Sequence, residues 1–265
     1  MLNPQNKQKI LNSLMNKNFV KIISGIKNYD KQKSLNVAMA AELGGATALD
    51  ICDDPEIIKP LRALVQLPIF VSSIDPLKLI ASQSYGIDAL EIGNYESFYK
   101  EGKMFTPSEI LDIARFVKKS VTLDVILCCT IPATLETENQ VKLARELIIL
   151  GYDIIQTEGF APEIPASDRT DIAHKDIRKA ASTLANTTSI RKALPNVSII
   201  TASGVTPATA PLAIAMGASG VGIGTYISTL SNQPEMTDGV KEIMARINSF
   251  APKYLVSEQS FALKH

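Results

Sequence analysis

The chain repeats one pattern, in which a run of β-branched residues is followed by a loop and then by a helix. Four helices are predicted to begin where an aspartate or a threonine precedes a proline: Asp54-Pro55, Asp75-Pro76, Thr106-Pro107 and Thr206-Pro207. The side-chain oxygen caps free amides of the first turn, and proline fits the first helical position because no amide is needed there. Strands are expected over residues 19–23, 46–51, 68–72, 88–92, 121–127, 153–157, 198–202 and 219–223. Eight alternations without a large insertion favour a closed (β/α)8 barrel, with an open doubly wound sheet as the alternative.

The length of the chain fits one domain of this kind. It has 265 residues, and roughly 250 residues is typical of a single (β/α)8 barrel. We therefore expect one domain over residues 1–265. Residues 1–18 are predicted to form a helical extension that plugs the bottom of the barrel. Residues 251–265 are predicted to form a tail that acts as a closing arm or as a contact in a homo-oligomer.

Composition argues against several classes of partner. The chain has 27 basic and 27 acidic residues and no long basic cluster, so neither nucleic acid nor an anionic membrane surface is expected. No apolar run reaches the roughly 18 residues of a membrane-spanning helix, and the first residues are too polar for a signal peptide. The three cysteines and two histidines form no metal-binding pattern, so no metal site is expected; they are Cys52, Cys128, Cys129, His174 and His265.

The most specific motif lies in residues 198–225. It reads as a strand, a Ser203-Gly204 turn, a helix, and a second strand that ends in the sequence GIGT. Two adjacent strand ends therefore offer backbone amides that no bulky side chain covers, and in (β/α)8 barrels the loops after the last two strands form the usual phosphate site. The alternative is that these glycines only let the helix and the strands pack closely. The predicted phosphate-binding residues are Ser203, Gly204, Gly222, Gly224 and Thr225.

Polar residues where the predicted strands end are the catalytic candidates, because barrel enzymes carry their chemistry at one mouth. Carboxylates that crowd one another there have raised pKa values and can act as acids or bases. Glu158 is the preferred base, and Lys21 would either stabilise an enolate from across the mouth or form a Schiff base. Some of the carboxylates would instead face outward and pair with helix residues. The complete candidate set is Glu158, Lys21, Asp124, Asp50 and Glu91.

The segment after Glu158 is the longest predicted loop. Residues 159–173 contain two prolines and mixed charges, a composition that favours a structured lid over a flexible tether. We expect this lid to cover the mouth and exclude water when a ligand binds. His174, at its far end, is expected to be a helix-start residue.

Six segments spread over the chain carry a family resemblance: KIISGIKNYD, ALDICDDP, ALEIGNYESFYKEG, DIIQTEG, TASGVTP and GVGIGT. Together they resemble the hypothetical chloroplast reading frame twenty-three family. The resemblance implies an aldolase-type TIM barrel located in the plastid stroma or in the cyanobacterial cytoplasm. It implies no particular activity.

Residues 198–225 also resemble the last quarter of phosphate-binding TIM-barrel enzymes, which include sugar-phosphate epimerases, thiamine-phosphate synthases and flavin mononucleotide oxidases. We therefore predict an isomerase, epimerase or lyase that acts on a small phosphorylated metabolite, by proton abstraction or carbon–carbon bond chemistry beside a carbonyl. This chemistry needs no cofactor. One alternative is an oxidoreductase that uses flavin mononucleotide (FMN). The other is a non-catalytic sensor of a phosphorylated effector.

Overall fold

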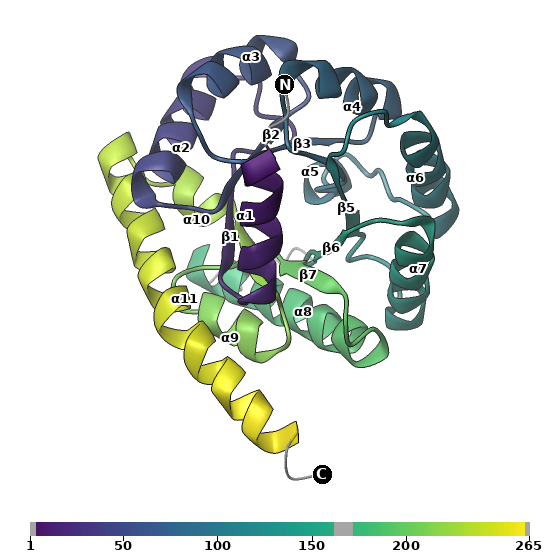
Figure 1. Cartoon of the computed structure of the whole chain (residues 1–265), viewed down its shortest axis with the longest axis vertical. Coiled ribbons are helices and arrows are strands. Elements are labelled where there is room, and N and C mark those ends of the chain that lie inside the picture. Colours follow the sequence, from purple (N-terminus) through teal and green to yellow (C-terminus); the bar gives the residue numbers. More distant parts are fainter. Residues whose placement is uncertain (1–3, 162–171, 263–265) are drawn as a thin grey trace, which may run out of the picture.

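The computed structural model describes residues 4–161 and 172–262, and its centre is a closed barrel of parallel strands (Figure 1). Each strand pairs with the next one along the chain, and the last strand pairs with the first, so the barrel has no open edge. This confirms the (β/α)8 barrel and excludes the open sheet. The strands are β1 (Phe19–Ile23), β2 (Ala48–Cys52), β3 (Ile69–Ser73), β4 (Ala89–Ile92), β5 (Ile126–Ile131), β6 (Ile154–Thr157), β7 (Ser198–Thr201) and β8 (Gly220–Ile223).

Helices form an outer layer around the barrel, except for one helix, α1, which lies across an end of the barrel (Figure 1). Among the described residues, no helix is both long and apolar enough to cross a bilayer. The helices are α1 (Pro4–Met15), α2 (Lys31–Gly44), α3 (Pro55–Leu64), α4 (Pro76–Ser82), the 3-10 helix η1 (Gln83–Tyr85), α5 (Glu96–Tyr99), α6 (Pro107–Ser120), α7 (Thr137–Leu150), α8 (Ile172–Ala193), α9 (Ala210–Ala215), α10 (Thr225–Ser228) and α11 (Gln233–Ala262).

Three of the four predicted helix starts are confirmed. Asp54 and Asp75 each accept a hydrogen bond from a first-turn amide, and Thr106 forms a capping box with a glutamate three residues later. The prediction at Thr206 is wrong. The backbone amide of Thr206 donates a hydrogen bond to Thr209 Oγ1 at 2.9 Å, and this bond closes a turn. Helix α9 begins only after Thr209. Threonine side chains that bond to nearby backbone groups offer such alternatives to a helical start.

The end of the chain also differs from the prediction. Helix α11 packs against α2 and α9 and continues to Ala262, and its last turns extend past the barrel in Figure 1. The expected tail after residue 250 is therefore helical as far as Ala262. The sequence over residues 251–262 contains no glycine, the residue that most often ends a helix in the left-handed conformation.

The inside of the barrel has two levels of different chemistry, because alternate residues of each strand face the axis. We call the lower one the apolar level; it packs against Ile10 and Leu14 of α1, which therefore closes this end of the barrel. Its residues are Phe19, Ala48, Phe70, Ala89, Ile126, Cys128, Ile154 and Ile200. Two residues further along six of the strands, the side chains are polar and buried. This polar level comprises Lys21, Asp50, Ser72, Glu91, Thr130 and Gln156.

Strand β5 begins later than predicted, which moves Asp124 away from the mouth. Val121 is the C-terminal cap of α6, and the loop after it reaches Ile126 before the strand begins. The Asp124 side chain is 84% exposed and pairs with Lys7 of α1, at the closed end of the barrel. Because a residue before a barrel strand lies at the end opposite the catalytic mouth, the prediction of Asp124 as a catalytic residue is wrong.

Candidate functional site

Lys21 lies inside the barrel and pairs with two carboxylates. Its ammonium group contacts Glu91 Oε2 and lies 3.4 Å from Asp50 Oδ2, and all three side chains are buried. Its Nζ atom also lies 4.8 Å from the ring centroid of Phe70, which belongs to the apolar level below. The fold thus brings three of the five catalytic candidates together. Their catalytic role stays a prediction.

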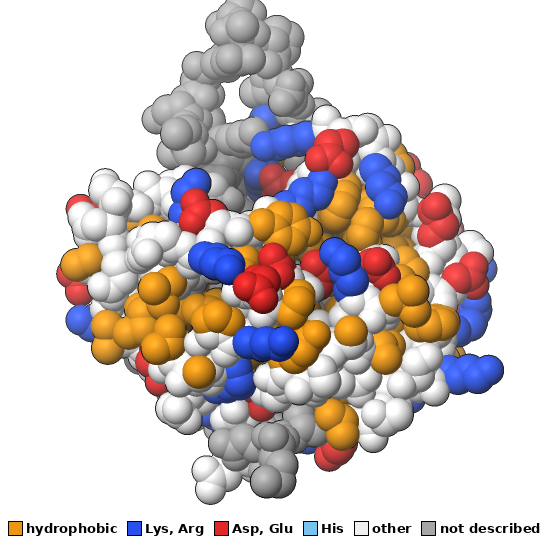
Figure 2. Space-filling view, turned by 90° about the horizontal axis from the view of Figure 1, so that it is seen from above, with side chains coloured by type: hydrophobic (Ala, Val, Ile, Leu, Met, Phe, Trp, Pro, Cys, Tyr) orange, Lys and Arg blue, Asp and Glu red, His pale blue; other side chains and the backbone are white. Residues whose placement is uncertain are grey.

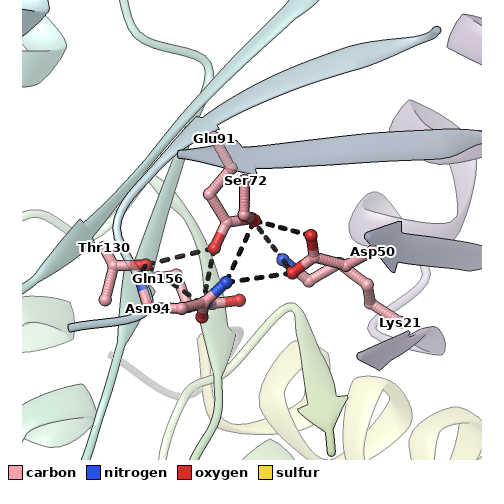
Figure 3. A network of polar contacts seen from close by, with 7 residues as sticks. All are labelled: Lys21, Asp50, Ser72, Glu91, Asn94, Thr130 and Gln156. Atoms are coloured by element: carbon pink, nitrogen blue, oxygen red, sulfur yellow. Dashed lines mark hydrogen bonds and ion pairs between the residues drawn. The ribbon is translucent and has the colours of Figure 1, made fainter. Parts of the chain in front are cut away.

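Four neutral side chains complete this buried cluster, namely Ser72, Asn94, Thr130 and Gln156. Figure 3 shows how they lie around the charged side chains. Ser72 Oγ donates to Asp50 Oδ1 at 2.6 Å, and Asn94 Nδ2 donates to Asp50 Oδ2 at 3.1 Å. Gln156 Nε2 donates to Glu91 Oε1 at 2.7 Å and to Asn94 Oδ1 at 2.8 Å, which joins the two halves of the cluster. Both carboxylates are therefore hydrogen-bonded as well as paired, as buried charges must be to be tolerated.

Asn94 reaches the cluster from the loop after β4 through an unusual backbone turn. Gly93 has a φ of 131° and Asn94 a φ of 65°. Asparagine tolerates the left-handed region better than most residues, and glycine adopts positive φ without strain. A Cβ atom on Gly93 would lie only 2.4 Å from Thr130 Cβ, so glycine is required for this close approach to β5. This turn places Asn94 between the buried cluster and the mouth of the barrel.

Burial and charge have opposite effects on the ionisation of Lys21. Burial lowers its pKa, but the negative charges of Asp50 and Glu91 more than offset this, so the pKa of Lys21 is raised above its ordinary value. Burial raises the pKa of Asp50 to about 6, while Lys21 and the hydrogen bond from Ser72 act in the opposite direction. Lys21 is therefore charged at neutral pH. A protonated amine is not nucleophilic, so the environment of Lys21 argues against the Schiff-base alternative.

Glu158 lies just after β6 and is held by groups from two other loops. Its Oε1 atom accepts hydrogen bonds from the Tyr99 hydroxyl and from the backbone amide of Ala133 at 3.3 Å, and its Oε2 accepts from the Tyr95 amide at 3.1 Å. Burial raises the pKa of Glu158 to about 7, although these donors favour the charged form. Burial and the nearby Glu158 charge also raise the pKa of Tyr99, which stays a neutral donor. Glu158 is therefore present in both protonation states near pH 7.

The two glycine-rich turns and Glu158 line one cavity at the mouth of the barrel. Its volume is about 180 Å³. The acidic Glu96 also lines it, but Lys179 of α8 pairs with Glu96 and compensates its charge. None of the three charged residues of the cluster below is among the lining residues; Asn94 is the cluster member that reaches the wall. The residues that line this cavity include Asn94, Glu158, Ser203, Gly204, Gly224 and Thr225.

The turns after β7 and β8 present free backbone amides to this part of the molecule. Ser203 and Gly204 have consecutive positive φ angles of 71° and 68°, which turns the chain sharply after β7. Gly224 is the N-cap of the short helix α10, whose first residue is Thr225. In the described part of the chain, the amides of these four residues have no hydrogen-bond acceptor. They are therefore available to an anion, which was the sequence-based expectation for these positions.

The structure separates two residues that we expected to act as a pair. Lys21 contacts Asp50 and Glu91, whereas Glu158 contacts Tyr99 and backbone amides, and only Glu158 lines the cavity. The physical reason is depth: Lys21 lies within β1 at the polar level, and Glu158 lies beyond the end of β6. The predicted opposition of Lys21 and Glu158 across a bound substrate stays a prediction. Of the predicted lid, residues 162–171 lie outside the described residues. His174 falls in the first turn of α8.

Sequence reasoning did not assign a role to Ser72, Asn94, Thr130 or Gln156. For three of them a signal was present, because Ser72, Thr130 and Gln156 each follow an apolar interior residue by two positions. For Asn94, the only signal in the sequence was its position directly after a glycine at the end of a predicted strand. Cys128 and Cys129 are buried, and burial raises the pKa of both thiols. Within residues 4–161 and 172–262, no group of three histidine, cysteine or acidic side chains could hold a metal ion.

The face drawn in Figure 2 carries charged side chains of both signs. Lysine and arginine side chains are interspersed there with aspartate and glutamate, and hydrophobic side chains lie between them. This mixed surface agrees with the net charge of zero. A basic stripe, the usual electrostatic mark of nucleic-acid binding, is not seen on this face.

Solved structures with a similar fold cover most of the chain. Thiamine phosphate pyrophosphorylase from Pyrococcus furiosus is 16% identical with a TM-score of 0.60, over 89% of this chain and 98% of that one. The native KDPGal structure is 13% identical with a TM-score of 0.59, over 88% and 96%. A truncated 3-deoxy-D-arabino-heptulosonate 7-phosphate synthase from Thermotoga maritima is 12% identical with a TM-score of 0.55, over 92% and 87%. At this level of identity the likeness shows the TIM-barrel fold.

Similar sequences come from algae. The uncharacterized protein ycf23 of the red alga Pyropia yezoensis is 38% identical over 238 residues, 90% of this chain and 85% of the relative. The ycf23 protein of the glaucophyte Cyanophora paradoxa is 34% identical over 241 residues, 91% and 97% of the two chains. These relatives are encoded in plastid genomes. The family model described as a protein of unknown function (DUF561) matches residues 5–252. The chain therefore belongs to the DUF561 family, together with the ycf23 proteins.

Proposed function

We propose that the chain is an enzyme that binds a small phosphorylated metabolite at the mouth of the barrel and moves a proton next to a carbonyl group of that metabolite. The observation that carries this proposal is that Glu158 and the amide-bearing turns at Ser203-Gly204 and Gly224-Thr225 line the same cavity. One end of that cavity offers donors for a phosphate group. Glu158 offers a carboxylate whose pKa of about 7 suits proton transfer at neutral pH.

Each part of the site has a defined task in this reaction. The amides of Gly204, Gly224 and Thr225, with the hydroxyl of Ser203, hold the phosphate. The Glu158 carboxylate takes a proton from the carbon beside the carbonyl, and the electron pair of that bond moves toward the carbonyl oxygen. Returning the proton to the other face of that carbon gives an epimerase, and returning it to the former carbonyl carbon of the enediol gives an isomerase. If the carbon next to the deprotonated one carries a leaving group, the electron pair instead forms a carbon–carbon double bond and the group departs with its own bonding pair, which gives a lyase.

The size of the cavity favours a small metabolite over FMN. At about 180 Å³, it is smaller than the roughly 300–1,000 Å³ clefts that take drug-sized ligands. A phosphate with a short carbon chain fits such a volume better than an isoalloxazine ring system does. The structural likeness to thiamine phosphate pyrophosphorylase and to a heptulosonate 7-phosphate synthase supports phosphate chemistry by analogy of fold only.

Two steps test the proposal. Native mass spectrometry of the purified protein would first identify a phosphorylated compound that remains bound. That compound, or otherwise a panel of triose, pentose and hexose phosphates, would then be incubated with the protein in deuterium oxide. We expect deuterium to enter the carbon beside the carbonyl, and Glu158→Gln to slow this exchange by about 10²–10⁴-fold.

The control in this experiment is phosphate binding by the same variant. Glu158→Gln keeps the size of the side chain and leaves the turns at Ser203 and Gly224 unchanged, so its affinity for inorganic phosphate should match that of the parent chain. Exchange that continues at the parental rate in Glu158→Gln would remove Glu158 as the base. Phosphate binding without any exchange would favour the sensor over the enzyme.

A further inference from the structure

One buried acceptor in the polar level has no partner. Gln156 is fully buried, and its amide nitrogen donates to Glu91 Oε1, to Asn94 Oδ1 and to Thr130 Oγ1. Its amide oxygen, Oε1, has no hydrogen-bond partner among the described residues. Leaving a buried acceptor unsatisfied costs about 1–3 kcal/mol, so this oxygen is a candidate ligand contact.

The neighbours of Gln156 fix which way its amide points. Exchanging the oxygen and the nitrogen of the amide would place Oε1 against the Glu91 carboxylate, 2.7 Å away, and against Asn94 Oδ1, 2.8 Å away. Both of these atoms are acceptors, and Asn94 cannot turn its own amide because its nitrogen already donates to Asp50 and Ser72. The orientation of the Gln156 amide therefore follows from the network.

The free oxygen of Gln156 lies beside Gly222, a residue of the cavity wall. A Cβ atom on Gly222 would lie 3.3 Å from Gln156 Oε1 and 3.2 Å from Ala202 Cβ. Gly222 and Ala202 both line the cavity that also contains the turns at Ser203 and Gly224. Gln156 is not itself a lining residue, but its unpartnered oxygen lies next to the position that a side chain on Gly222 would occupy.

We propose that Gln156 Oε1 accepts a hydrogen bond from a hydroxyl group of the phosphorylated metabolite and thereby selects phosphate esters that carry a hydroxyl on their carbon chain. This inference rests on the proposed phosphate site and adds the substrate class to it. An amide oxygen is only an acceptor. A ligand that places a hydroxyl there gains a hydrogen bond, whereas a ligand with a methylene or a carbonyl there leaves the oxygen unsatisfied.

The test compares three ligands by titration calorimetry: inorganic phosphate, propyl phosphate and glycerol 3-phosphate. The last two have the same carbon chain and differ in the hydroxyl groups. We expect the parent chain to bind glycerol 3-phosphate roughly tenfold more tightly than propyl phosphate, the size of effect that one satisfied buried acceptor gives. In Gln156→Met this preference should fall to about one while the affinity for inorganic phosphate is retained.

Two further variants separate ligand contact from disturbance of the cluster. Thr130→Val also removes a hydrogen bond to Glu91 and one acceptor of the Gln156 amide nitrogen. The bonds from Gln156 to Glu91 and Asn94 still fix the direction of its oxygen, so the roughly tenfold preference should persist. Gly222→Ala leaves Gln156 in place and puts a methyl group in front of its oxygen, so the preference should be lost even if Gln156→Met does not fold.

The possible results distinguish this inference from the proposed function. If the parent chain binds inorganic phosphate but shows no preference for glycerol 3-phosphate, or if Gln156→Met and Gly222→Ala keep the preference, the role of Gln156 is wrong and the phosphate site stands. If the parent chain binds none of the three ligands, both the phosphate site and the inference built on it are wrong. Loss of the preference in both variants, with Thr130→Val unaffected, supports the contact.

Discussion

The two levels inside the barrel are built on the same strands and differ in almost every other respect. On β1 the apolar Phe19 is followed two residues later by Lys21, and on β4 Ala89 is followed by Glu91. The apolar level is closed from below by α1. The polar level carries three charges and a dense hydrogen-bond network. A step of two residues along a strand thus leads from the apolar level, which packs against α1, to the polar level, which carries the charged groups.

The polar level itself is uneven around the barrel. Six strands contribute polar side chains. At the corresponding positions, Ala202 directly follows β7 and Gly222 lies in β8. These small residues line the cavity, and the loops that follow them carry the free amides. Space for a ligand therefore lies beside the two strands that place no large side chain at this level, whereas the side chains of the other six fill the axis of the barrel.

The largest expected effect is on stability and comes from removing the one cation of the buried cluster. Lys21→Met should lower the free energy of unfolding by about 3–5 kcal/mol at neutral pH, because Asp50 and Glu91 would remain buried without a counter-charge. Urea unfolding would measure this loss. The double variant Lys21→Met with Glu91→Gln should recover part of it, since it removes one of the two unpaired charges. A midpoint equal to that of the parent chain would mean that the cluster is hydrated or already neutral.

A change in α1, which packs against the apolar level, should affect stability alone. Ile10 of α1 is fully buried against the lower end of the barrel. Ile10→Ala should cost about 3 kcal/mol, the sum of lost burial and the remaining cavity. Its affinity for inorganic phosphate should equal that of the parent chain, because no lining residue of the mouth is touched. Weakened phosphate binding in a folded Ile10→Ala protein would show that the two levels are coupled.

The smallest effect is a pH dependence that belongs to Glu158. Its pKa is about 7 in the folded chain, above the ordinary glutamate value of 4.5, so the folded state binds the proton more tightly than the unfolded state does. This stabilisation is complete below the unfolded pKa and is lost as the pH rises through the folded pKa. Between pH 5 and 7.5 the parent chain should lose about 2 kcal/mol more than Glu158→Gln. Urea unfolding at both pH values would check the difference, and parallel curves would contradict the burial of an ionisable Glu158.

Much of the fold could be predicted from local signals. The caps at Asp54, Asp75 and Thr106 gave correct helix starts, and the strands could be placed because turn residues separate short β-branched runs. The errors arose where local signals were ambiguous. Val121 and Thr122 look like strand residues, but Val121 ends α6. This misplaced the strand and put Asp124 at the wrong end of the barrel.

The candidate site was less accessible from the sequence, because it depends on contacts between distant residues. Lys21 and Glu91 are seventy positions apart, and nothing local indicates that they pair. The positions of Ser203 and Gly224 were predictable since their turn chemistry is local. The unpartnered oxygen of Gln156 could not have been predicted, because it follows from the three-dimensional network around Glu91 and Asn94.

The central claim is that the turns after β7 and β8 form an anion site, and calorimetric titration with inorganic phosphate tests it most directly. The key variant is Gly224→Leu: a Cβ atom there would approach nothing closer than 3.5 Å, so the barrel should fold, while the longer side chain should obstruct the amides. We predict that the parent chain and Ile10→Ala bind phosphate equally and that Gly224→Leu, with an intact cooperative unfolding transition, does not. Equal binding by Gly224→Leu, or no binding by the parent chain, would contradict the account.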